Sequence, residues 1–161
     1  MTPYFATGAI LSSDDRYRYA LWRAWQPCSQ WLIFIGLNPS TADAEEDDPT
    51  IRRCVAFGKA WGYHGMLMMN LFAYRATKPT DMFTALDPVG PDNDHFLRHY
   101  ASMSPEVVAA WGAHGAHRGR DMQVRSMLYG RLKCLRVNRD GSPAHPLYLP
   151  GSLTPQPWVP Q

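Results

Sequence analysis

The chain has 161 residues, of which 45% are hydrophobic and 19% charged, and its formal net charge is +2. This size and balance predict one globular domain and exclude a disordered or low-complexity protein. No apolar run approaches the roughly 18 residues of a membrane span, and residues 1–4 lack the basic and apolar regions of a signal peptide, so we expect a cytoplasmic protein. Within a single domain over residues 1–161, we expect an N-terminal hairpin region (1–28), a core (29–150) and a C-terminal tail (151–161).

A β-hairpin is predicted near the N-terminus. Residues 4–11 and 16–25 flank a polar turn cluster, Ser12-Ser13-Asp14-Asp15. In the second arm large apolar or aromatic residues alternate with polar or small ones: Tyr17, Tyr19 and Leu21 against Arg16, Arg18 and Ala20. This period of two is typical of a strand with one buried face.

The rest of the chain alternates apolar strands with helices. Strands are predicted over 31–35, 66–69, 107–111 and 133–137, and helices over 49–61, 80–86, 91–102 and 116–130. Asp48-Pro49 marks the start of the first helix, with Asp as the N-cap and Pro at the first helical position. The alternation predicts a three-layer α/β/α fold, in which helices cover both faces of a four-stranded parallel sheet.

Charge is distributed unevenly along the chain. Residues 1–110 carry nine Lys/Arg against twelve Asp/Glu, whereas residues 111–161 carry seven against two. The basic segment can form a phosphate-binding patch or a solvated helix face, and charge alone does not separate these interpretations. The acidic residues concentrate in a loop, 43–48, directly before the first helix, where they favour its N-terminus.

The candidate ligand site lies at the carboxyl ends of the predicted strands, where parallel sheets bind ligands. The first of these loops reads Gly36-Leu37-Asn38-Pro39-Ser40-Thr41-Ala42. Gly36 permits a turn that a Cβ would forbid, and Pro39 stiffens the loop. Asn38 therefore presents a fixed amide that can hold a water molecule or a polar ligand atom, with Ser40 beside it.

Two further segments offer candidate site residues. Asn70 ends the second strand, where its amide offers a donor and an acceptor to the edge of a base. Arg75 follows it and can bind phosphate or pair with the acidic loop. His145, in a late loop rich in Pro and Gly, can stabilise a developing anion.

We expect neither a metal nor a cofactor. Cys28, Cys54 and Cys134 contain no C-x-x-C pattern, so free thiols are predicted. Two histidine pairs, 95 with 99 and 114 with 117, lack a third ligand at a recognisable spacing. There is no phosphate-binding P-loop and no Rossmann glycine pattern, which excludes the usual sites for nucleoside triphosphates and NAD.

Several of these motifs resemble those of the uracil-DNA glycosylase superfamily, especially its mismatch-specific and thymine branches. The resemblance rests on Gly36-Leu37-Asn38-Pro39, on the strand ending at Asn70, on the segment after it with Arg75, and on His145-Pro146, in the right order over about residues 31–150. Over nearly its full length the chain also resembles a prokaryotic domain family of unknown function, whose motifs it carries as GLNPSTA, DPTIRRC, NLFAYRAT, DPVGPxND, AWGxHG and HPLYL.

The superfamily resemblance implies a hydrolase of base excision that cleaves the N-glycosidic bond of a modified or mismatched base. A base would be flipped into the pocket, Asn38 would position the attacking water, His145 would stabilise the departing base and Asn70 would read its edge. Gly36, Pro39, Ser40 and Arg75 would complete the substrate site. The alternative is a non-catalytic module that binds nucleotides or nucleic acid with the same pocket; an enzyme of different chemistry on the same fold is a third hypothesis. The acidic loop next to the expected mouth would repel a DNA backbone.

Overall fold

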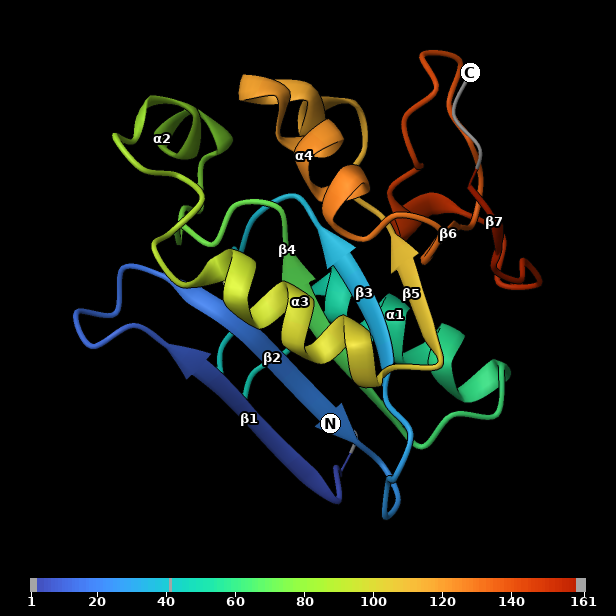
Figure 1. Ribbon diagram of the computed structural model, residues 1–161. Helices are drawn as coiled ribbons and strands as arrows, with labels where there is room; N and C mark the ends of the chain where they lie inside the picture. Colours follow the sequence, from blue (N-terminus) through green and yellow to red (C-terminus); the bar gives the residue numbers. More distant parts are fainter. Residues whose placement is uncertain (1–2, 41, 159–161) are drawn as a thin grey trace.

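The computed structural model describes residues 3–40 and 42–158 (Figure 1). The strands are β1 (Ala6–Leu11), β2 (Arg18–Ala24), β3 (Leu32–Gly36), β4 (Gly65–Asn70), β5 (Glu106–Ala109), β6 (Leu132–Cys134) and β7 (Gln156–Pro157). The helices are α1 (Pro49–Ala60), α2 (Pro79–Thr84), α3 (Asn93–Met103) and α4 (Arg120–Met127), with short 3₁₀ segments η1 (Ala113–Gly119) and η2 (Pro146–Tyr148). The chain therefore has the mixed α/β character that its sequence predicts.

The expectation of a four-stranded parallel sheet is wrong, because the strands form one seven-stranded sheet in the order β1-β2-β4-β3-β5-β6-β7. The pairs β3/β4, β3/β5 and β5/β6 are parallel, whereas β1/β2, β2/β4 and β6/β7 are antiparallel. The predicted hairpin is present as β1 and β2. Strand β2 pairs with β4 on the side opposite to β3. Part of the expected tail forms β7 against β6.

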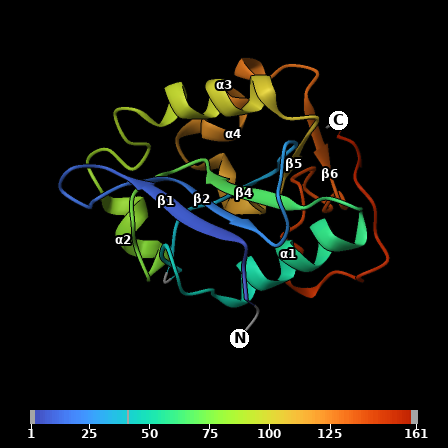
Figure 2. The same ribbon diagram turned by 90° about the horizontal axis from the view of Figure 1, so that it is seen from below.

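Helices cover both faces of the sheet (Figure 2). Because side chains of a strand alternate between the faces, Leu32 and Phe34 of β3 pack on the side of α1, and Ile33 and Ile35 pack on the side of α3 and α4. All four are at most 1% exposed. A strand buried on both faces explains why residues 31–35 are an uninterrupted apolar run.

The first helix begins and ends where its sequence predicts. Asp48 is the N-cap and accepts a hydrogen bond from the backbone N–H of Ile51 (2.8 Å), and Pro49 occupies the first turn. The single helix expected over 116–130 is wrong, because the chain forms η1 and then α4. Arg118 (φ 54°) and Gly119 (φ 66°) adopt left-handed backbone conformations that interrupt helical hydrogen bonding.

The thiols agree with the prediction of free cysteines: Cys54 and Cys134 are buried and Cys28 is half-buried, and none forms a disulfide within the described chain. None of the helices described in residues 3–40 and 42–158 is long and apolar enough to cross a membrane.

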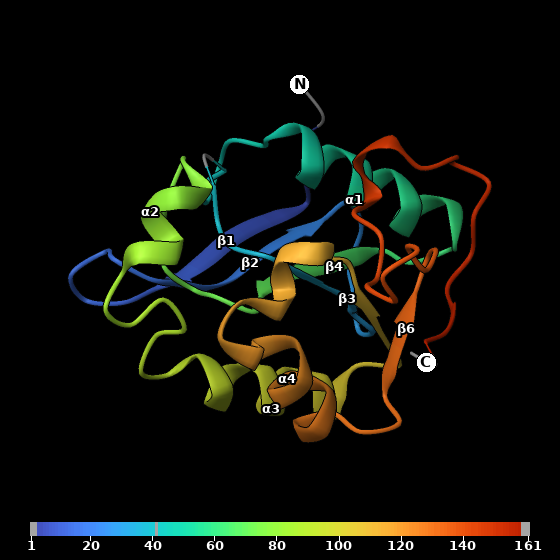
Figure 3. The same cartoon turned by 90° about the horizontal axis from the view of Figure 1, so that it is seen from above.

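One edge of the sheet collects the segments that carry the candidate site. The parallel strands β4, β3 and β5 end there, and Figure 3 looks onto this edge. Because β2 runs antiparallel to β4, its first residue, Arg18, lies at the same edge and donates its backbone N–H to the carbonyl of Ala73 (2.9 Å). The late loop reaches the edge through the N–H of Gly112, which donates to the carbonyl of Pro143 (2.9 Å).

Candidate functional site

A cavity of about 440 Å³ opens at this edge of the sheet. Its polar lining comes from segments far apart in the sequence: Arg18, Asn38, Ser40, Asp48, Asn70, His114 and His145. Its apolar lining includes Leu37, Ile51, Met68, Trp111 and Leu147. The cavity falls in the size range of small-molecule sites, about 300–1,000 Å³, and combines apolar walls with convergent polar groups as such sites do.

Asn38 is held in one orientation by the backbone around it. Its Nδ2 donates to the carbonyl oxygens of Pro39 (3.0 Å) and Ala76 (3.1 Å). The opposite assignment of the amide would set an oxygen against two carbonyl oxygens, so these contacts fix which atom is nitrogen. The Oδ1 atom is consequently the group that Asn38 can offer to a ligand or a water molecule.

Asn70 brings a buried donor to the cavity. The residue is 3% exposed, and its Nδ2 has no hydrogen-bond partner among the described residues. It is the register partner of Gly36 at the ends of β4 and β3. A buried donor without a partner is costly, so this amide is suited to a ligand that supplies an acceptor.

His145 stands at the start of η2 and caps it. Its Nδ1 accepts the backbone N–H of Leu147 (3.2 Å), which leaves Nε2–H as the donor of the neutral ring. Although the residue is exposed to solvent, desolvation by the surrounding protein lowers the pKa of His145, and the Asp48 carboxylate opposes this shift. The lowered pKa favours the neutral ring.

Ser40 and Asp48 form a linked pair in the cavity wall. Ser40 Oγ donates to Asp48 Oδ2 (2.8 Å), while the other carboxylate oxygen caps α1. Pro39 does not line the cavity, and its carbonyl instead accepts from Asn38 and from the N–H of Ala76 (3.3 Å). Thr41 of the same motif lies outside the described residues.

Arg75 is not brought to the cavity that the other predicted residues share. Its Nη1 donates to the carbonyl of Asp15 (3.1 Å) and its N–H to the carbonyl of Arg16 (2.9 Å), which fastens the hairpin turn. It lines a neighbouring hollow beside α2, which shares Ala76 and Thr77 with the cavity. The substrate-binding role of Arg75 stays a prediction.

Arg18 is the cavity residue that sequence reasoning missed. The alternation along the second hairpin arm placed it on the polar face, but the residue is 2% exposed. The strand alone does not reveal this burial, because it arises when β2 becomes an inner strand of the sheet and the segment at Ala42 packs over Arg18.

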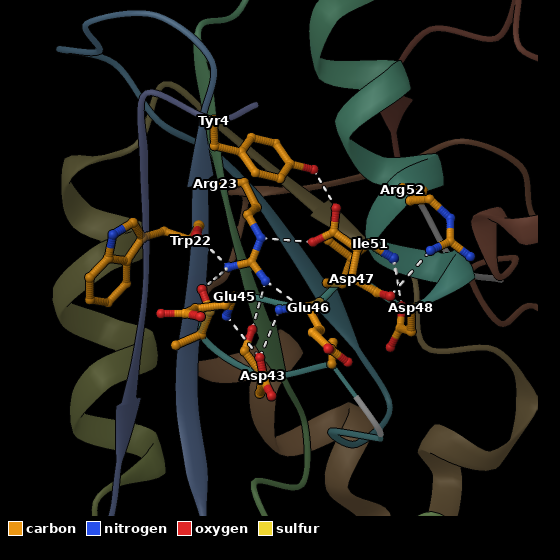
Figure 4. A network of polar contacts seen from close by, with 12 residues as sticks. Tyr4, Trp22, Arg23, Asp43, Glu45, Glu46, Asp47, Asp48, Ile51 and Arg52 are labelled. Atoms are coloured by element: carbon orange, nitrogen blue, oxygen red, sulfur yellow. Dashed lines mark hydrogen bonds and ion pairs between the residues drawn. The ribbon is translucent and has the colours of Figure 1, made fainter. Parts of the chain in front are cut away.

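The acidic loop before α1 is folded around a buried arginine (Figure 4). The side chain of Arg23 is fully buried; its Nε pairs with Asp47 (2.7 Å), and its other nitrogens donate to the carbonyls of Trp22, Asp43, Ala44 and Glu46. Asp43 Oδ1 accepts the N–H groups of Glu45 and Glu46 (2.8 and 2.7 Å), and these hydrogen bonds lower the pKa of Asp43. The loop is thus an organised support for α1, in which Asp43, Glu45 and Glu46 are still exposed to solvent.

The basic C-terminal segment does not form one continuous patch. Arg120 is buried and pairs with Asp94 (2.6 Å), and Lys133 pairs with Glu106 (2.9 Å). Arg118 and Arg131 donate to backbone carbonyls, and Arg125 stacks on Trp158 with its guanidinium carbon 4.9 Å from the ring centre. Most of these cations therefore have tertiary roles.

The histidine pairs do not build a metal centre in the described part of the chain. No group of three or more His, Cys, Asp or Glu side chains there is arranged to hold a metal ion. His95 and His99 stack on each other on α3 (6.2 Å between ring centres). His114 and His117 both pack against the ring of Phe83, with 5.4 and 4.8 Å between the ring centres.

Residues 18–147 match the model of a family described as "Protein of unknown function (DUF1643)". The matched range includes every polar residue that lines the cavity. The searches of curated proteins and of solved structures gave no match. None of the comparisons links the chain to the uracil-DNA glycosylase superfamily.

Proposed function

Because the chain belongs to the DUF1643 family, whose description assigns no activity, we propose its function from the cavity: a glycosylase-like hydrolase that cleaves the N-glycosidic bond of a modified or mismatched base in nucleic acid. The observation that carries this proposal is the convergence of Asn38, Asn70 and His145 on one cavity from three separate segments. The resemblance of their motifs to those of uracil-DNA glycosylases supports the same chemistry.

Asn38 would position the attacking water. With Nδ2 held by two carbonyls, Oδ1 can accept a hydrogen bond from the O–H of water. It cannot take up the proton, because an amide is not a base. The reaction must therefore be dissociative: the bond between the sugar carbon and the base nitrogen breaks first, and its electron pair leaves with the base. Water oxygen then bonds to the oxocarbenium-like sugar, and the proton that it releases balances the one taken up by the base.

His145 and Asn70 would act on the departing base. The neutral His145 ring can direct Nε2–H at the negative charge that develops on the base, since Nδ1 is occupied by Leu147. One preorganised donor of this kind is worth about 3–4 kcal/mol in a transition state. The unpartnered Nδ2 of Asn70 would bind an acceptor on the edge of the base.

A non-catalytic module that binds nucleotides or nucleic acid is the second candidate, and one observation favours it. Among the described residues that line the cavity, Asp48 supplies the carboxylate, and both its oxygens already accept hydrogen bonds from Ser40 and Ile51. These hydrogen bonds make the Asp48 carboxylate a weaker base for a water in the cavity. Binding without hydrolysis would follow if the amide of Asn38 alone does not suffice.

A screen separates the two candidates. Oligonucleotides with modified or mismatched bases, as duplexes and single strands, are incubated with the protein alongside the matching nucleosides, and base release and binding are both measured. Abasic-site formation with at least one substrate supports the hydrolase, with the Arg98→Gln variant on α3 as an active control outside the cavity. Binding without release from any substrate would reject the hydrolase in favour of the binding module.

A further inference from the structure

Three arginines of this protein are almost wholly buried, and one differs from the other two. Arg23 pairs with Asp47 and Arg120 pairs with Asp94, at 2.7 and 2.6 Å. Arg18, 2% exposed, has no carboxylate within ion-pair distance among residues 3–40 and 42–158. A buried cation without a counter-charge is strongly disfavoured unless something else supplies one.

Only some of the hydrogen-bond donors of the Arg18 guanidinium have partners in the described chain. Nη1 donates to the carbonyl of Ala42, whereas Nε has no partner among the described residues. Burial lowers the pKa of Arg18 to about 10, and the charge of nearby Asp48 opposes this shift, so the group is still a cation at neutral pH. The Nε side of a guanidinium is suited to bidentate binding of phosphate oxygens.

The start of α1 adds little positive charge beside Arg18. Thr50 and Ile51, in the first turn of this twelve-residue helix, line the same cavity. Pro49 has no N–H, however, and the N–H of Ile51 is already bonded to the Asp48 carboxylate, which offsets the partial charge of the helix N-terminus. The attraction of an anion therefore rests on the Arg18 guanidinium itself, while hydrogen bonds from Ser40 and Ile51 reduce the repulsion by Asp48.

We propose that Arg18 binds a phosphate group of the ligand, so that the cavity takes a nucleotide rather than a bare nucleoside. The buried amide of Asn70 and the buried guanidinium of Arg18 then have complementary tasks, the first for the base and the second for its phosphate. This inference rests on the proposed function for the identity of the ligand as a nucleotide. The phosphate belongs either to a free nucleotide or to a nucleic-acid strand, and the two are separated by experiment.

The test compares binding by calorimetry at fixed ionic strength. The probes are inorganic phosphate, nucleoside 5′-monophosphates, the corresponding nucleosides, and oligonucleotides of the same bases. Wild-type protein is expected to bind inorganic phosphate, and to bind monophosphates about tenfold or more tightly than nucleosides, as a charged hydrogen bond allows. Arg18→Gln should lose this preference and Arg18→Lys should keep part of it. Arg98→Gln, on α3 and away from the cavity lining, should keep it fully.

Folding is checked separately. Arg18→Met should unfold at the same temperature as wild type or higher when phosphate is absent, because it removes a buried charge that no carboxylate balances. If Arg18→Gln and Arg18→Met both fail to fold, Arg18 is needed for the fold itself, and the proposal is overturned. Equal affinity of wild type for nucleosides and monophosphates would overturn it as well.

The remaining arms identify the source of the phosphate and keep the two proposals distinct. Tighter binding of oligonucleotides than of monophosphates assigns the phosphate to a strand, and the reverse order assigns it to a free nucleotide. Binding that depends on Arg18 without base release would keep the phosphate site and reject the hydrolase. Base release that is indifferent to phosphate would keep the hydrolase and reject the phosphate site.

Discussion

Gly36 and Asn70 are register partners at the ends of β3 and β4, and a Cβ built on Gly36 would lie 2.9 Å from Oδ1 of Asn70. Carbon atoms do not approach an amide oxygen so closely without displacing it. The glycine of the first motif thus makes room for the amide of the second. Two sequence motifs more than thirty residues apart are joined by this contact into one site.

Gly36→Ala should therefore impair the ligand site more than the fold. The new methyl group would push the Asn70 amide out of position, and we expect at least a tenfold loss of nucleotide affinity, corresponding to one misplaced buried hydrogen bond. Calorimetric titration measures it. Gly151→Ala is the matched control, because a Cβ there meets the Arg53 guanidinium at an ordinary 3.9 Å. Unchanged affinity in Gly36→Ala would show that the Asn70 amide is not used.

The titration of His145 tests whether its pKa is lowered, as the neutral ring requires. Because its pKa is lowered in the folded protein, its NMR midpoint should fall below about 6.5, the value of an unperturbed histidine. The folded state then binds fewer protons than the unfolded state, so the contribution of His145 to stability is lost as the pH falls through and below about 6.5. The amide signal of Leu147, which donates to Nδ1, should move with the same midpoint.

Asp48→Asn provides the control for this titration. The carboxylate of Asp48 raises the pKa of His145, so its neutralisation should lower the midpoint further. Asparagine is also a good N-cap, which keeps the start of α1 intact. A midpoint at or above that of wild type in this variant would contradict the assignment.

The buried Arg23–Asp47 ion pair is expected to contribute strongly to the stability of the fold. Arg23→Ala should lower the free energy of unfolding by about 3 kcal/mol or more, since it leaves Asp47 and several loop carbonyls without their donor in a largely buried setting. Urea denaturation measures the loss. Arg16→Ala removes a solvent-exposed partner of Asp14 at 3.7 Å and should leave the free energy of unfolding nearly unchanged. Equal losses in the two variants would mean that the acidic loop is not anchored by Arg23.

The elements best predicted from sequence are those that local chemistry determines. The apolar runs at 31–35 and 66–69 gave β3 and β4, and Asp48-Pro49 located the start of α1. The same logic brought Asn38 and Asn70 to one edge, because parallel strands end together. His145 instead reaches it through the late loop, which Gly112 holds at Pro143.

The features that sequence reasoning missed depend on contacts between distant segments. Arg18 is buried because β2 pairs with β4, and β7 exists because residues 156–157 reach β6. Contacts with the hairpin turn place Arg75 beside the cavity and not in its lining, and its substrate role stays a prediction. The break between η1 and α4 follows from two consecutive left-handed residues, and non-glycine residues such as Arg118 rarely signal that conformation.

The most direct test of the hydrolase is the single-turnover rate of base release by Asn38→Ala on a substrate identified in the screen. If Asn38 positions the attacking water, this variant should lose at least a hundredfold in rate, as the removal of a preorganised polar group does elsewhere, while its affinity for the substrate changes by less than about threefold. Thermal unfolding checks that the variant stays folded without the hydrogen bonds from Asn38 to Pro39 and Ala76. A rate within about threefold of wild type would contradict the central role assigned to Asn38.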